Sequence, residues 1–276
     1  MRYAALRAND GRRTKREWEG SKPLTVLALS GLSAALLLAS PAHAQSVDEF
    51  GAYHPRERGR YFESPQHAAL EIRVGRYIPN VDSEFSQATP YQTTFGTRNR
   101  YSVGLEVDWQ VLRIPYVGTL GPGLAIEYTK STAASFNTQT GERTPGENTS
   151  LIIFPINLVA VLRADFIARE TPVPLVPYAK LGVGTAIWRV SNGGGTARVG
   201  SSAGSGLSYG PQLALGGMLL LDAFDRTSAM SLDSEIGINN SYVFMEWYLS
   251  KLDGFGSGSQ MEVGTSTWVL GLAFEM

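Results

Sequence analysis

Hydrophobic and polar positions alternate along much of this chain after residue 67. The clearest case is segment 100–111, in which the odd positions from Tyr101 to Val111 are all apolar or aromatic and the even positions are polar or glycine. Successive side chains of a β-strand point to opposite faces, so a period of two predicts strands. The alternation predicts eight of them, over residues 68–78, 100–111, 120–131, 149–163, 175–189, 207–221, 239–249 and 266–276.

The two faces of these segments differ in character. One face is apolar and aromatic, whereas the other carries glycine, alanine and charged residues. Segment 239–249 is ambiguous, because Phe244 and Tyr248 stand on the face that should be polar. A soluble antiparallel sandwich also alternates, but its solvent face would carry more Lys, Glu and Thr. Small residues suit a narrow lumen, so the pattern favours an all-β fold, an eight-stranded antiparallel up-and-down transmembrane β-barrel with long outer loops.

The connections between the predicted strands also alternate in length. The long polar ones are 79–99, 132–148, 190–206 and 250–265, and the shorter ones are 112–119 and 164–174. Outer-membrane barrels have long outer loops and short periplasmic turns, which assigns the four long connections to the outside. Connection 222–238 is longer than a turn, and we expect one or two helical turns over 229–236 with Ser228 as the N-cap.

The N-terminal segment has the order of a secretory signal peptide. Residues 1–22 are rich in Arg and Lys, the 17 residues of 24–40 are apolar and uncharged, and Ala42-His43-Ala44 offers a cleavage site. The alternative is an uncleaved anchor, for which the apolar run is slightly short. We therefore expect a signal peptide over 1–44, a periplasmic lead-in over 45–66 and the barrel over 67–276.

The last predicted strand resembles the C-terminal signal of bacterial outer-membrane barrels, which ends on a hydrophobe and is read by the assembly machinery. The residues that carry this resemblance are Trp268, Leu270, Gly271, Leu272, Phe274 and Met276. Aromatic residues elsewhere on the apolar face fall near strand ends and suit interfacial girdles. They are Tyr101, Trp109, Tyr128, Phe154, Tyr209 and Trp247.

Charge and cysteine content narrow the function classes. Of the 24 basic and 25 acidic residues, seven basic and three acidic ones lie in 1–44, so the remainder carries a net charge of −5. That balance gives no support for nucleic-acid binding. The chain has no cysteine, which removes disulfides, thiolate nucleophiles and sulfur metal ligands together.

Eight charged residues stand on the small-residue face and are expected to line the lumen. They are Glu71, Arg73, Glu106, Asp108, Glu127, Arg163, Lys180 and Glu246. Buried charges are tolerated only when they are paired and hydrogen-bonded, so a structural plug of ion pairs is the first interpretation. A narrow pathway whose acidic excess favours cations is the alternative. Glu106 and Asp108 could also serve acid–base chemistry, although any i, i+2 pair shares a strand face.

A lipid-modifying enzyme is the competing function class. Barrels resembling a lipid A deacylase or a palmitoyl transferase use a His near a Ser, whereas here His54 lies in the lead-in and His67 just before the first strand. The acidic loop positions lack the spacing of a calcium loop. We therefore expect no enzyme activity, no cofactor and no metal site.

Several short motifs, taken in order, resemble a family of myxobacterial outer-membrane β-barrel proteins of unassigned function. They are Leu70-Glu71-Ile72-Arg73, Asp82-Ser83-Glu84-Phe85, Pro177-Tyr178 with Lys180, Gly237-Ile238-Asn239, and the stretch from Trp268 to Phe274. The resemblance runs from about Glu63 to Met276. It implies a barrel in the outer membrane of a Gram-negative bacterium, similar in architecture to OmpA and OmpW, and no activity.

The sequence thus predicts an integral outer-membrane protein with a structural or surface-interaction role and a side-chain-filled polar lumen. A narrow channel for ions or small molecules is the alternative, and a lipid-modifying enzyme ranks below it. The expected partners are outer-membrane lipids and, during biogenesis, the barrel-assembly machinery and periplasmic chaperones. We expect a monomer that binds no nucleic acid.

Overall fold

The computed structural model describes residues 67–136, 142–199 and 201–276, which belong to one compact unit. The expected signal peptide (1–44) and lead-in (45–66, with His54) lie outside the described residues. Within the part of the chain that is described, no helix has the length and apolar character needed to cross a bilayer.

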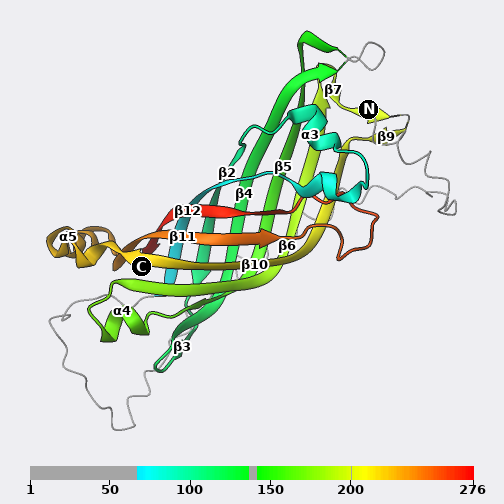
Figure 1. The fold of residues 1–276 in the computed structure, drawn as a ribbon. Helices are drawn as coiled ribbons and strands as arrows, with labels where there is room; N and C mark the ends of the chain where they lie inside the picture. The colour runs from blue at the N-terminus through cyan, green and yellow to red at the C-terminus, as the bar shows by residue number, and fades with distance from the viewer. Residues whose placement is uncertain (1–66, 137–141, 200) are drawn as a thin grey trace, which may run out of the picture. The chain divides into compact units, whose positions relative to one another are not determined.

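Eight strands close into an antiparallel barrel (Figure 1). They are β1 (Ala68–Arg76), β2 (Tyr101–Trp109), β4 (Gly118–Phe136), β5 (Arg143–Arg163), β6 (Leu175–Asn192), β10 (Ser205–Leu220), β11 (Asn240–Ser250) and β12 (Thr265–Glu275). Each strand pairs with the next one in this order, and β1 pairs with β12 to close the ring, with Ile72 opposite Leu272. The predicted eight-stranded up-and-down barrel is confirmed.

The alternation in sequence becomes an alternation between the outside and the inside of the ring. In β2, Leu105 is 54% exposed, whereas its neighbour Glu106 is fully buried. The same pattern runs along β1 and β12, where Val74 and Leu270 face outward as cross-strand partners. The apolar face is therefore the outer surface of the barrel, and the small and charged face lines its interior.

The barrel has two different ends. At the long-loop end lie the connections 77–100 and 251–264, together with the described residues of the β4–β5 and β6–β10 connections. At the short-loop end lie 110–117, 164–174 and 221–239. His67 and Met276 also lie at the short-loop end, where the His67 N–H donates a 3.0 Å hydrogen bond to the Met276 carbonyl.

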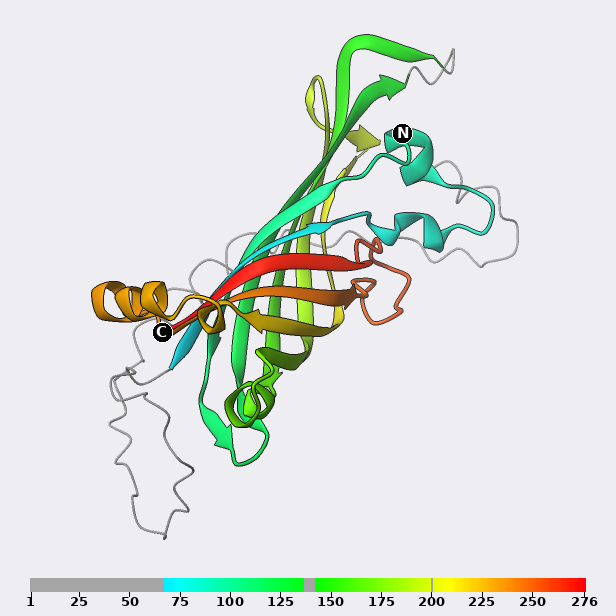
Figure 2. The same ribbon diagram turned by 60° about the vertical axis from the view of Figure 1, so that its left-hand side comes forward.

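The hairpin of β4 and β5 is longer than the sequence pattern predicts. The expected loop 132–148 is largely strand, because β4 continues to Phe136 and β5 begins at Arg143. Figure 2 shows both strands running past the ends of β11 and β12. Cross-strand pairing continues to Ala134 opposite Asn148 and, after a register shift, to Phe136 opposite Arg143. The polar sequence of this extension gives no alternating pattern to detect. Backbone hydrogen bonds hold the two strands together there without an apolar face.

The connections contain short elements that alternation does not reveal. These are η2 (Asn80–Glu84), α3 (Pro90–Phe95), β3 (Leu112–Ile114), α4 (Phe166–Glu170), β7 (Gly195–Thr196), β8 (Arg198–Val199), β9 (Ser202–Ala203) and η3 (Leu221–Ala223). Strand β3 forms a hairpin with the start of β4, and α4 follows β5 at the same end of the barrel.

The predicted helix between β10 and β11 is present but begins earlier than expected. Helix α5 spans Arg226–Ile236, so Ser228 lies inside it and is not the N-cap. Asp225 takes that role, because its carboxylate accepts a 3.1 Å hydrogen bond from the Thr227 N–H. A side-chain acceptor just before the first helical residue satisfies one of the free backbone donors of the first turn.

One apolar cluster lines the inner faces of β6, β10, β11 and β12. It includes Tyr178, Phe244 and Tyr248. This cluster resolves the ambiguous segment 239–249, because Phe244 and Tyr248 are each 1% exposed and point inward, while Met245 between them is 51% exposed. Their side chains help to fill the lumen, which is narrow because the barrel has only eight strands.

A second apolar cluster closes the long-loop end. It joins Tyr77, Tyr91 and Phe95 from the β1–β2 connection to the inner faces of β5 and β6. The Tyr77 hydroxyl donates to the Val263 carbonyl at 2.6 Å, and the Tyr91 hydroxyl lies 2.8 Å from the Ser131 hydroxyl. The loops at this end are thereby held against the extended wall of β4, β5 and β6.

Candidate functional site

The interior of the barrel brings together all eight charged residues that the sequence places on its inner face. Their exposed fractions range from 0 to 3%. They come from six strands: Glu71 and Arg73 from β1, Glu106 and Asp108 from β2, Glu127 from β4, Arg163 from β5, Lys180 from β6 and Glu246 from β11. Residues far apart in sequence become neighbours because the ring folds every inner face toward one axis.

Arg73 links its own strand to strands on both sides of it. Its guanidinium forms ion pairs with Glu106 on the neighbouring strand β2 and with Glu246 on β11, two strands away in the other direction. Glu127 Oε1 lies 3.8 Å from Arg73 Nε, and the guanidinium carbon is 5.7 Å from the centre of the Tyr248 ring. A charge buried this deeply is stable only with such partners.

Lys180 is the second centre of the network. Its Nζ lies 2.6 Å from Glu71 Oε2, 2.8 Å from Glu106 Oε1 and 3.7 Å from Glu246 Oε2. The ammonium also lies 5.2 Å from the centre of the Tyr178 ring, within the range of a cation–π interaction. One ammonium thus joins carboxylates from three strands.

Arg163 extends the network toward the short-loop end. Its Nη2 pairs with Glu71 Oε1 at 2.9 Å and with Asp108 Oδ2 at 2.5 Å, and its Nη1 lies 3.3 Å from Glu275 Oε1. Glu275 stands on the inner face of the sequence pattern but is not among the expected lumen charges. Its carboxylate is in fact part of the network, and it also accepts hydrogen bonds from Gln110, Asn240 and Tyr242.

Tyrosines on the inner face are the other group that the sequence pattern did not identify. The Tyr178 hydroxyl donates to Glu246 Oε2 at 2.8 Å, and the Tyr242 hydroxyl donates to Glu275 Oε2 at 2.8 Å. Their position opposite the apolar face was a usable signal, because a buried phenol requires a hydrogen-bond partner.

Glycines make room for the large side chains of the interior. A Cβ at Gly271 would lie 2.5 Å from the Phe244 ring and 2.1 Å from the Ile72 carbonyl oxygen. A Cβ at Gly216 would lie 2.8 Å from the Tyr178 ring. These glycines allow aromatic rings and ion pairs to share a narrow lumen.

The cations of this network neutralise only part of its negative charge, because carboxylates outnumber them. Three cations, Arg73, Arg163 and Lys180, face six carboxylates among the described residues. Carboxylate oxygens of Glu71, Glu106 and Asp108 lie within 4.8 Å of one another, a spacing that could hold a metal ion. Lys180 and Arg163 already pair with these oxygens, and their positive charge would repel such an ion.

The outer surface forms an apolar belt around the ring. Its aromatic members include Tyr101, Trp109, Tyr128, Tyr209 and Trp268, whose exposed fractions lie between 41 and 61%. In the closing strand, Trp268, Leu270, Leu272 and Met276 are exposed on the outside, Phe274 is half-buried on the same face, and Gly271 faces the interior. The strand therefore contributes to the belt and also closes the ring against β1.

No protein-family model and no curated protein matches this chain. Among solved structures, Ail, the attachment invasion locus protein of Yersinia pestis, is 12% identical with a TM-score of 0.39, covering 78% of this chain and 100% of Ail. The N-terminal β-barrel domain of Pseudomonas aeruginosa OprF is 12% identical with a TM-score of 0.36, over 77% of this chain and 100% of that domain. A major outer membrane protein from Thermus thermophilus is 11% identical with a TM-score of 0.32, over 76% of this chain and 99% of that protein.

Proposed function

We propose that this chain is an integral outer-membrane β-barrel protein with a structural or surface-interaction role. One observation carries the proposal: a closed ring of strands exposes its apolar face and buries its charged face. Leu105 is 54% exposed beside a fully buried Glu106, which is the reverse of a water-soluble protein. A closed barrel in a bilayer satisfies every backbone group within the ring while its apolar side chains meet lipid.

Strand length agrees with a bilayer. Strands β1 and β2 have nine residues each and β11 and β12 have eleven each. A tilted strand needs roughly 9–11 residues to cross the hydrocarbon core. The wall formed by β1, β2, β11 and β12 thus matches the thickness of one hydrocarbon core. The longer strands β4, β5 and β6 extend beyond it at the long-loop end.

The proposed orientation places the long-loop end outside the cell and the short-loop end in the periplasm, in keeping with the usual arrangement of loops and turns. The surface role would then belong to the extended wall of β4, β5 and β6 and to the loops packed against it. Tyr77 and Tyr91 hold those loops in place, so they present a fixed surface.

The proposed lumen is closed to solutes, because Arg73, Lys180, Phe244 and Tyr248 pack across it and are at most 1% exposed. The second candidate is a narrow cation pathway, favoured by the excess of carboxylates over cations inside. Planar-bilayer recording of the purified protein separates the two. A flat trace across a range of voltages is expected, whereas reproducible cation-selective steps would favour the channel.

Depth-dependent substitution tests the membrane assignment. Leu105 lies in the middle of β2 and Tyr101 at its long-loop end, on the same outer face. In a bilayer, Leu105→Arg should destabilise the barrel by about 2–4 kcal/mol and Tyr101→Arg by only about 0–1 kcal/mol. Urea titration in lipid vesicles measures both, together with heat-modifiable migration of outer-membrane fractions. Equal, small effects at both positions, with the protein soluble in the periplasm, would overturn the assignment.

The proposal includes no enzyme activity and no cofactor. Four expectations from the sequence stay predictions. They are that the barrel is monomeric, that it is inserted by the assembly machinery with the help of periplasmic chaperones, that its signal peptide is cleaved, and that it belongs to the myxobacterial family. Unchanged lipid A mass spectra on overexpression are expected, and a new acylation state of lipid A would contradict the non-enzymatic role.

A further inference from the structure

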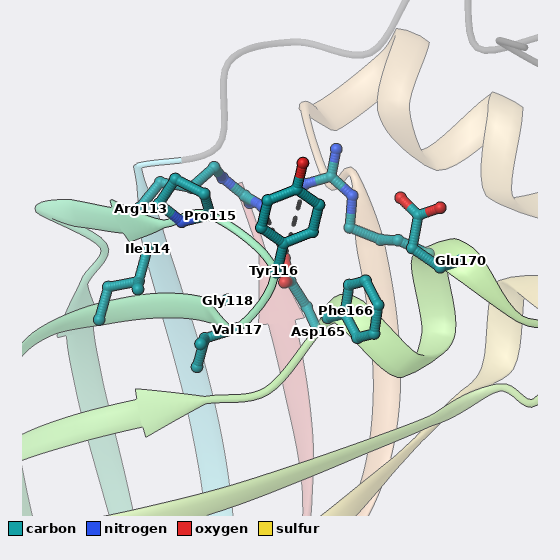
Figure 3. A pocket seen from close by; sticks show the side chains of 10 residues that line it. Arg113, Ile114, Pro115, Tyr116, Val117, Gly118, Asp165, Phe166 and Glu170 are labelled. Atoms are coloured by element: carbon teal, nitrogen blue, oxygen red, sulfur yellow. Dashed lines mark ion pairs between the residues drawn. The ribbon is translucent and has the colours of Figure 1, made fainter. Parts of the chain in front are cut away.

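We propose that the corner between β3 and α4 at the short-loop end binds the zwitterionic headgroup of an ethanolamine phospholipid from the periplasmic leaflet. The proposal rests on the membrane assignment above and names a lipid site within it. A cavity of about 250 Å³ lies at this corner, lined by residues 113–118 of the β3–β4 hairpin and by Asp165, Phe166, Arg169 and Glu170 (Figure 3). Enclosed small-molecule sites usually hold roughly 300–1,000 Å³, so this one suits a headgroup whose acyl chains stay outside.

The cavity offers two guanidinium groups to a phosphate. Arg113 and Arg169 converge on one oxygen, Asp165 Oδ2, at 3.0 and 3.7 Å. Their side chains are 46 and 49% exposed, so both remain accessible to a ligand that enters the cavity. Two positive charges sharing one carboxylate leave one positive charge to be balanced, and a phosphate accepts hydrogen bonds from guanidinium forks well.

The same cavity offers partners to an ammonium group. Glu170 lines it beside Arg169, and the exposed Tyr116 ring presents a face that can accept a cation. Two basic and two acidic side chains together match a headgroup that carries one charge of each sign. The Glu170 carboxylate can accept hydrogen bonds from the primary ammonium of ethanolamine, whereas the trimethylated ammonium of choline has no hydrogen to donate. A purely anionic headgroup would meet Glu170 without a positive partner.

The backbone at Tyr116 supports a role for its ring. Tyr116 has a φ of 62°, in the left-handed region that favours glycine, and its side chain is 84% exposed. A glycine would occupy this turn without strain. The chain instead places a large aromatic side chain there, and its centroid lies 6.4 Å from that of Phe166 in an edge-to-face arrangement. Strained backbone that displays a side chain is a pointer to function.

The cavity is continuous with the apolar belt. Leu112 and Val117 are 53 and 38% exposed on the same hairpin, and Val111 just before it is 75% exposed. Figure 3 shows Ile114 and Val117 directed away from the charged groups, toward the strands of the barrel. A lipid whose headgroup occupies the cavity would therefore find apolar side chains along the path of its acyl tails, as expected at a membrane interface.

Native mass spectrometry of the purified full chain in detergent tests the proposal. Phosphatidylethanolamine, phosphatidylcholine and phosphatidylglycerol with identical acyl chains are added separately. We expect ethanolamine lipid to bind at least fivefold more than the other two. The double variant Arg113→Gln with Arg169→Gln should lose that binding at least fivefold, and Glu170→Gln should erase the preference for ethanolamine over choline. Arg98→Gln removes an exposed charge from the long-loop end and should change nothing.

Equal ethanolamine-lipid binding by the wild type and the double variant would overturn the site. A preference for phosphatidylglycerol, or displacement by millimolar inorganic phosphate, would also overturn it, because either points to a general anion site. If the double variant shows no heat-modifiable migration, it has not folded, and Tyr116→Gly replaces it in the test. This variant relaxes the turn and keeps both arginines, so it should fold and still bind ethanolamine lipid more weakly. Failure of the Leu105→Arg and Tyr101→Arg depth series would instead refute membrane insertion itself.

Discussion

Lys180 Nζ lies 2.6 Å from Glu71 Oε2, although the two residues are 109 positions apart and stand on strands that do not pair with each other. The contact crosses the lumen and joins β6 to β1. Both side chains are fully buried. Their pairing shows that the interior of the barrel is held together by ion pairs across its diameter as well as by the backbone ladder around its wall.

The first prediction concerns the loss of this cation. Lys180→Met should destabilise the barrel by about 3–5 kcal/mol, because Glu71 and Glu106 would remain buried without their ammonium partner. Urea titration in vesicles measures the change. Adding Glu71→Gln to Lys180→Met should restore part of the lost stability, since one unpaired charge is removed.

Lys251→Met is the matched control, because Lys251 is 60% exposed and pairs with Asp253 at 3.4 Å. An exposed pair of this kind contributes at most about 1 kcal/mol. Comparable losses for Lys180→Met and Lys251→Met would show that the buried network does not carry stability.

The second prediction concerns the space reserved by glycine. Gly271→Ala should destabilise the barrel by about 1–3 kcal/mol, because the added methyl group would overlap the Phe244 ring and the Ile72 carbonyl. Gly217→Ala is the control, since its Cβ would meet only Leu175 at 3.5 Å, an ordinary contact. That control should be neutral or stabilise the fold by up to about 1 kcal/mol. The same urea titration applies, and indistinguishable midpoints for the two variants would contradict the packing argument.

The third prediction concerns pH at the long-loop end. Burial raises the pKa of Tyr91 above its ordinary value of 10.0, and the hydrogen bond with Ser131 opposes this effect only in part. A phenol whose pKa is raised by folding contributes stability that is present below the unfolded pKa and is lost as pH rises through the folded one. Protease resistance of the β1–β2 connection should therefore decline above about pH 10.

Tyr91→Phe isolates that effect. The variant should have lower resistance at neutral pH, because the hydrogen bond with Ser131 is gone, and a flatter decline in resistance above about pH 10, because the ionisable group is absent. Limited proteolysis across this range measures both. A decline of the same steepness in the wild type and the variant would exclude Tyr91 as its source.

The fourth prediction concerns the closing strand. Changing both Phe274 and Met276 to Asp should sharply reduce the amount of protein in the outer membrane, because the proposed assembly signal and the outer face of the β12 seam are altered together. Ser266→Asp adds a charge to the same outer face at the other end of β12 and should leave membrane levels close to normal. Immunoblots of membrane fractions give the readout, and normal levels of the double variant would count against the signal.

The sequence was sufficient to predict the fold and most of the residues that line the lumen. The features that it missed share one cause, because alternation is informative only where the two faces of a strand differ in polarity. Alternation located all eight strands and placed Glu106, Lys180 and Arg163 on the inner face, because a period of two reports which side of a strand meets an apolar phase. It could not find the extended part of the β4–β5 hairpin, where neither face of the strands is consistently apolar. It also left Phe244 and Tyr248 ambiguous, because an aromatic residue fits either a lipid-facing surface or a packed lumen.

Local sequence therefore determined which residues form strands and which of their faces is apolar, since both properties depend only on neighbours two positions apart. Tertiary structure alone decided which buried charges meet. Lys180 reaches Glu71, Glu106 and Glu246 because closure of the ring brings three separate strands around one point. Tertiary structure likewise created the Arg113, Asp165 and Arg169 corner, whose members come from two different connections. Such contacts depend on ring size and strand register, which arise from the pairing of the whole sheet and not from any single segment.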